Sequence, residues 1–163
     1  MRLTRTINVA LPPDEVFALW ADLERSPEYS AASIERRNLG GAAVGVGSRF
    51  HAVDRWPGRK VEFTVEVTAF DPPRRMAASW SEPMPGWWEA RFSPAGEGTE
   101  VAFTTVMEPS GAMAVFTNLM RPWAARQLGR FMRDFRAWAE RQPTSSIGRL
   151  GSTPAEARTT TAR

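Results

Sequence analysis

The sequence has no cysteine and only one histidine, His51, among its 163 residues. Without cysteine the chain can form no disulfide bond, no thiolate metal site and no thiol nucleophile. A single histidine cannot build a histidine-rich metal cage, so we expect neither a metal ion nor another cofactor. A lone histidine among strand residues is more often structural than catalytic, and we assign no mechanism to His51.

Long hydrophobic runs are also missing. No apolar stretch approaches the roughly 20 residues that a membrane-spanning helix needs. The first 15 residues, MRLTRTINVALPPDE, lack the uninterrupted apolar segment of a secretory signal. We therefore expect a cytoplasmic protein with no integral membrane association.

Lysine is nearly absent, and the basic isoelectric point of about 10.4 rests on arginine. Most arginines alternate with acidic residues, as in ERRNLG and RFMRDFRAWAER. A surface that tracks nucleic-acid phosphates would need a one-sided basic cluster instead. The sequence therefore predicts no nucleic-acid partner, and it leaves a homodimer open.

The hydrophobic content of 42% is sufficient for one core in a chain of this length. Residues 143–163 are small and polar and follow no hydrophobic pattern. We expect one domain over residues 1–142 and a disordered tail over residues 143–163.

Alternation of polar and apolar residues predicts most of the strands. Residues 61–69 alternate strictly, with valine, phenylalanine and alanine on one parity and glutamate and threonine on the other. Similar segments, separated by turn residues, lie at 3–10, 34–39, 48–56, 76–81, 87–94 and 100–108. The short connections predict an antiparallel meander of about seven strands.

Three segments have helical patterns. The stretch LPPDEVFALWADL, residues 11–23, has proline and two acids where a first helical turn favours them. In SPEY, residues 26–29, Ser26 is expected to cap a second short helix or a turn. A long helical pattern covers residues 112–142, and Pro122 should kink or break it.

Several short motifs carry a resemblance to a known family. They are LPPDEVF followed by WAD (residues 11–22), SP (26–27), GVGS (45–48), FDPPR (70–74) and GTEV (98–101). In this order and spacing they resemble the helix-grip fold of the START and Bet v 1-like superfamily, in particular its polyketide cyclase/dehydrase and lipid-transport-like branch. The resemblance covers residues 3–141. It implies an α+β fold in which a curved antiparallel sheet wraps a long C-terminal helix, with two short helices after the first strand.

The resemblance also implies that the space between sheet and helix is a ligand cavity. Strand parity and the helical stripe then predict which side chains line it. The expected ligand-binding residues are Phe63, Val65, Met76, Trp80, Trp88, Phe92, Phe103, Thr105, Met107, Met120, Trp123 and Phe131. Trp87 and Trp88 are adjacent, so only one of them can point inward from a regular strand. The expected ligand is a small hydrophobic molecule, ring-containing or similar to a lipid or polyketide.

Three functions remain open from the sequence. The first is non-catalytic binding of that molecule for transport, sensing or sequestration, which needs only a cavity with few polar groups. The second is a cyclase, aromatase or dehydratase acting on a poly-keto substrate, for which the sequence presents no evident acid–base pair. The third is a protein-interaction module of the same fold.

Overall fold

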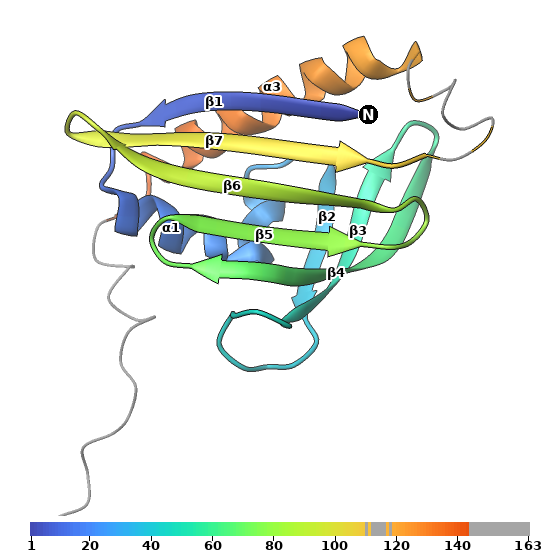
Figure 1. Ribbon diagram of the computed structural model, residues 1–163, viewed down its shortest axis with the longest axis horizontal. Helices are drawn as coiled ribbons and strands as arrows, with labels where there is room; N and C mark the ends of the chain where they lie inside the picture. The colour runs from blue at the N-terminus through green and yellow to red at the C-terminus, as the bar shows by residue number, and fades with distance from the viewer. Residues whose placement is uncertain (110, 112–116, 118, 144–163) are drawn as a thin grey trace, which may run out of the picture.

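Seven antiparallel strands form one curved sheet in the described part of the computed structural model, which covers residues 1–109, 111, 117 and 119–143. The described residues also include the α-helices α1 and α3 and one 3₁₀ helix (Figure 1). The elements are β1 (Arg2–Val9), α1 (Pro13–Ala21), η1 (Leu23–Glu28), β2 (Ser33–Asn38), β3 (Arg49–Trp56), β4 (Arg59–Asp71), β5 (Arg75–Trp80), β6 (Gly86–Ala95), β7 (Gly98–Met107) and α3 (Arg121–Ala139).

The strand order is β1-β7-β6-β5-β4-β3-β2, so β1 and β2 form the two edges. Strands β2 to β7 are sequential neighbours, and β1 pairs with β7, the last strand. Helix α3 packs along β1, and α1 contacts β6 and β7. Figure 1 shows both helices on the same side of the sheet, with α1 near one end of α3. This arrangement confirms the helix-grip fold expected from the sequence.

The sequence signals account well for α1. Pro13 stands at its start, the acids Asp14 and Glu15 occupy the first turn, and the apolar face is buried. The expectation for the next helix was wrong in one respect, because Ser26 lies inside η1 and does not cap a helix. Ser26 is buried, and its hydroxyl lies 3.0 Å from that of Ser33.

Strand parity is interrupted once within β4. The register against β5 shifts between Val67 and Ala69, so that Phe70 pairs with Met76. Because of this bulge, Phe70 joins the core on the helix side in place of Ala69, whose parity matched the preceding valines. The shift brings Phe70 to the ring of Phe17 on α1, with 5.3 Å between ring centroids.

Helix α3 begins at Arg121, with Pro122 in its first turn, where a missing N–H group costs nothing. Pro122 therefore marks a helix start and does not kink the described helix. From Leu128 onward the helix buries a stripe made of Leu128, Met132, Phe135 and Trp138. Of the longer helical segment expected from the sequence, residues 112–116 and 118 lie outside the described residues, as do residues 144–163 of the expected tail.

Candidate functional site

The indole of Trp20 lies at the centre of the apolar contacts between α1, the sheet and α3. Trp20 is only 3% exposed. It makes ring contacts with two strands and with α3, at centroid distances of 4.8–6.2 Å and mostly edge to face. The rings around it are those of Trp88, Phe92, Phe103, Phe131 and Phe135. We call Trp20 and these five residues the ring cluster.

One polar atom in the ring cluster has no hydrogen-bond partner among the described residues. The Trp20 Nε1 atom is buried and makes no hydrogen bond within the described part of the chain. An indole nitrogen can only donate, so this N–H group needs an acceptor. Trp138 offers a contrast, because its Nε1 donates to Glu28 Oε2 at 2.9 Å.

Burial changes along the inner face of the sheet. Near α1, Phe92 and Phe103 are buried, with exposed fractions of 4% and 7%. Toward the C-terminal ends of β5 and β7 and the N-terminal end of β6, the inward side chains are only half-buried. Among the expected ligand-binding residues, Val65, Met76, Phe92 and Phe103 are buried, whereas Phe63, Trp80, Trp88, Thr105, Met107, Met120 and Phe131 are half-buried.

The structure resolves two expectations about tryptophan. Trp88 faces inward, since its ring lies 5.9 Å from Phe103 and 6.2 Å from Trp20, while Trp87 points to the opposite face of β6. Trp123 was expected to line the space between sheet and helix. It lies in the first turn of α3, is 43% exposed and belongs to neither apolar cluster of the described core, so that placement was wrong.

A charged pair interrupts the apolar inner face near its half-buried end. Arg36 on β2 and Asp54 on β3 share the parity of Ala52, which pairs with Phe63. Arg36 Nη2 lies 2.8 Å from Asp54 Oδ1, and the Arg36 guanidinium stands 5.8 Å above the Phe63 ring. Burial raises the pKa of Asp54 above its usual value, although the charge of Arg36 acts in the opposite direction.

Among the described residues, neither Tyr29 nor His51 forms a polar network that would indicate acid–base catalysis. Tyr29 is buried against Phe131, Phe135 and Trp138, and this burial raises the pKa of its hydroxyl. His51 lies on the outward face of β3, opposite Arg37 and Thr64. No described hydrogen bond involves the side chain of either residue.

The site residues that the sequence analysis missed are Trp20, Arg36 and Asp54. A parity signal for Asp54 was present, because it follows Phe50 and Ala52 on the apolar parity of its strand. Trp20 lies within the helical stretch predicted over residues 11–23, but nothing in the sequence indicated an unpaired N–H group. Within the described residues, no group of three or more His, Cys, Asp or Glu could hold a metal ion, and no helix is long and apolar enough to span a membrane.

Comparison with known proteins identifies the family. Residues 1–140 match the family described as polyketide cyclase / dehydrase and lipid transport. The chain belongs to this family. The match covers all of the described strands, α1, η1 and α3, and therefore the ring cluster and the Arg36–Asp54 pair as well.

Solved structures share the fold at low sequence identity. TTHA0849 from Thermus thermophilus has a TM-score of 0.73 and 20% identity, with 85% of this chain and 97% of that chain covered. The ZhuI aromatase/cyclase from Streptomyces sp. R1128 has a TM-score of 0.71 and 18% identity, with 86% and 94% covered. At these identities the similarity establishes the fold alone.

A curated relative matches part of the chain. Rv0088 of Mycobacterium tuberculosis is 33% identical over 92 residues, which is 56% of this chain. The matched region spans 40% of the length of that relative.

Proposed function

We propose that this protein binds a hydrophobic, ring-containing molecule between the sheet and α3 and holds it for transport, sensing or sequestration. The observation that supports this proposal is the buried Trp20 Nε1–H group, which has no acceptor within the described residues. A buried donor without a partner costs about 1–3 kcal/mol. A carbonyl or hydroxyl oxygen on the ligand would supply the missing acceptor and recover part of that free energy.

The surrounding side chains suit the rest of such a ligand. Phe63, Trp80 and Trp88 are half-buried and face the helix side of the sheet, and the half-buried Phe131 lies on α3. Flat, rigid rings give a large apolar contact area while losing little side-chain entropy. The ligand class is therefore a neutral aromatic or polycyclic molecule with one oxygen acceptor directed at Trp20.

A pair of probes can isolate the role of the acceptor. 2-Acetylnaphthalene and 2-ethylnaphthalene have the same ring system and nearly the same size, but only the ketone can accept a hydrogen bond. Isothermal titration calorimetry should give micromolar binding of the ketone and about tenfold weaker binding of the hydrocarbon, which corresponds to about 1.4 kcal/mol.

Two variants then test whether Trp20 is the donor. Trp20→Phe retains an aromatic ring but removes the N–H group, so it should abolish the tenfold preference for the ketone. Trp138→Phe is the matched control. The Trp138 N–H group already donates to Glu28, so its removal should leave the preference for the ketone unchanged. A preference that survives in Trp20→Phe, or no binding of either probe to the wild type at micromolar concentration, would overturn the proposal.

A second candidate is a cyclase, aromatase or dehydratase acting in the same space. The Arg36–Asp54 pair favours it, because a carboxyl group whose pKa is raised by burial retains a proton at a higher pH than an exposed one. Asp54→Asn separates the two candidates. The enzyme hypothesis predicts that this variant still binds 2-acetylnaphthalene but loses turnover of a poly-keto thioester, measured by mass spectrometry. No turnover by the wild type contradicts that hypothesis.

A further inference from the structure

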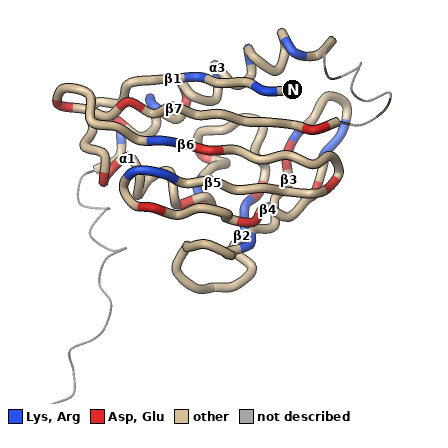
Figure 2. Tube along the Cα trace, viewed as in Figure 1, with Lys and Arg blue, Asp and Glu red and all other residues tan. Residues whose placement is uncertain are grey.

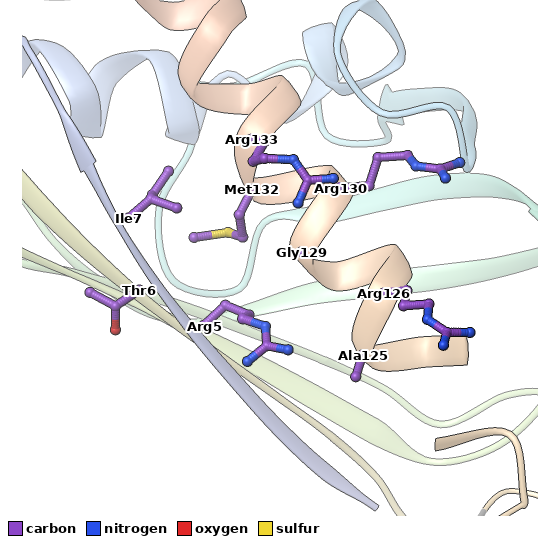
Figure 3. Close-up of a pocket in the computed structure, with 9 residues that line it drawn as sticks. All are labelled: Arg5, Thr6, Ile7, Ala125, Arg126, Gly129, Arg130, Met132 and Arg133. Carbon is purple, nitrogen blue, oxygen red and sulfur yellow. The ribbon is translucent and has the colours of Figure 1, made fainter. Parts of the chain in front are cut away.

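A hollow of about 580 Å³ lies between the edge strand β1 and α3, apart from the ring cluster. Figure 3 shows Ile7 and the Met132 side chain directed toward each other across this space. Met132 is buried and Ile7 is half-buried, so the floor of the hollow is apolar. Its charged lining consists of Arg5 on β1 and Arg126, Arg130 and Arg133 on α3.

Arg5 occupies an unusual position for a charged residue. It lies on β1 opposite Phe103, on the same side of the sheet as Leu3 and Ile7, and therefore faces α3. Figure 3 shows its guanidinium reaching from β1 toward α3. An inward charge on an edge strand can also prevent pairing with another sheet. Preventing strand pairing needs only the charge of Arg5, so it does not explain why a second arginine lies close to the same point.

Arg133 on α3 and Arg5 on β1 both reach toward Gly129. Arg133 Nη1 lies 3.8 Å, and Arg5 Nε 3.9 Å, from the point where a Cβ atom on Gly129 would stand. The two guanidinium groups thus approach one point from opposite walls of the hollow. Glycine within a helix is less favourable than alanine, and at this position its missing side chain leaves the space between the two cations open.

The charge in the hollow is not neutralised by ion pairs within the described residues. Arg126, Arg130 and Arg133 follow each other at steps of four and three residues on α3, where like charges repel. Within the described part of the chain, none of these three arginines forms an ion pair, and neither does Arg5. The arginines that do form ion pairs there are Arg25, Arg36, Arg37, Arg74, Arg75, Arg91 and Arg136. Figure 2 shows basic positions on both β1 and α3, which run alongside each other.

We propose that the β1–α3 hollow binds the phosphate group of a small organic molecule. The tetrahedral oxygens of a phosphate can accept hydrogen bonds from the guanidinium groups of both walls at once, whereas a planar carboxylate fits one guanidinium fork. The hollow is larger than a single phosphate requires and has the size of small-molecule sites. The organic body of the ligand then lies on Ile7 and Met132.

Phenyl phosphate is the probe, with inorganic phosphate and phenol as its separate halves. In calorimetry at about 150 mM salt, near physiological ionic strength, phenyl phosphate should bind the full chain more tightly than inorganic phosphate, and phenol should not bind. Arg5→Gln and Arg133→Gln should each weaken the affinity about tenfold. Arg136→Gln, on the same helix but paired with Glu140, changes the net charge equally and should alter the affinity less than twofold.

A second pair of variants tests Gly129, the position that the guanidinium groups of Arg5 and Arg133 both approach. Gly129→Glu places a carboxylate between Arg5 and Arg133, so it should abolish phenyl phosphate binding while retaining the fold. Gly129→Gln fills the same space without the charge and should retain part of the affinity. Equal losses in both variants would show that space, and not charge, controls binding, which would overturn the assignment.

Two further experiments test whether the phosphate comes from a membrane surface or from RNA. The wild type is sedimented with phosphatidylcholine vesicles containing phosphatidic acid, and it is titrated with duplex RNA. Tight binding to either, weakened by Arg5→Gln but not displaced by phenyl phosphate, would contradict a small-molecule site. An equal loss of phenyl phosphate affinity in Arg5→Gln and Arg136→Gln would contradict it too, since net charge alone would then explain the binding.

Discussion

The indole of Trp80 lies against the backbone of Gly86, its partner across β5 and β6. A Cβ atom on Gly86 would stand 2.8 Å from Trp80 Cε2 and 2.7 Å from the backbone oxygen of Val106. The absence of a side chain at Gly86 therefore allows Trp80 to cover the sheet. In this position the Trp80 ring lies 6.1 Å from that of Phe63, at the half-buried end of the inner face.

Gly86→Ala should destabilise the protein by about 1–3 kcal/mol, the usual cost of overpacking a filled site. The backbone of β7 cannot move away easily, so the Trp80 ring must give up its position. Urea denaturation should show a lower midpoint, and binding of 2-acetylnaphthalene should weaken as well.

The control is Gly129→Ala, in the interior of α3. A Cβ atom there meets only flexible arginine side chains at ordinary contact distance. This variant should raise the free energy of unfolding by about 0.5–1 kcal/mol, because alanine is the better helix former. If Gly86→Ala is as stable as the wild type, Trp80 does not pack over Gly86 as described.

Glu28 connects η1 to the end of α3 and should make stability depend on acid pH. Its hydrogen bonds from Arg25, and secondly from Trp138, hold the pKa of Glu28 below its usual value of 4.5. A lowered pKa in the folded state stabilises the protein above pH 4.5, and this contribution is lost as the pH falls through the folded pKa. Because Glu28 is partly exposed, the contribution should be about 0.5–1 kcal/mol.

Urea midpoints of the wild type and Glu28→Gln measure this contribution. At pH 7 the variant should be less stable than the wild type, and at pH 3 the difference should shrink toward zero. A difference that is the same at both pH values would mean that the carboxylate charge of Glu28 contributes nothing.

Truncation distinguishes the expected tail from the end of the domain. Removing residues 144–163 should change the thermal midpoint little, because the sequence there has few apolar residues to bury. Removing residues 141–163 also deletes Gln142, which accepts a hydrogen bond from Arg25 and donates one to Trp138. That longer truncation should lower the midpoint by about 2–4 °C, the shift expected for about 1 kcal/mol. A comparable drop in the shorter truncation would contradict the expected domain boundary.

The sequence predicted the fold because its elements are strongly patterned. Strand alternation placed Trp88, Phe92 and Phe103 on the helix side, where the structure has them. Trp123 was misplaced, since its position in the helical pattern did not reveal that the described helix begins at Arg121. A helical stripe indicates which residues share a face, but not where along the helix contact with the sheet ends.

The charged residues of the inner face were harder to interpret. Asp54 and Arg5 each break an apolar parity, and that break was visible in the sequence. Their partners were not predictable, because Arg36 and Arg133 come from other elements and meet them only in the folded chain. A charged residue on an apolar parity is thus a useful signal for a site, although it does not identify the contact that the side chain makes.

NMR of the indole N–H groups tests directly whether the Trp20 N–H group donates a hydrogen bond to a bound ligand. The Trp20 signal is the one missing from ¹⁵N-labelled Trp20→Phe. Saturating 2-acetylnaphthalene should move this signal downfield more than that of Trp138, whose N–H group already donates to Glu28. 2-Ethylnaphthalene should not produce the same shift. A Trp20 signal that stays in place while the ketone saturates the protein would contradict the claim.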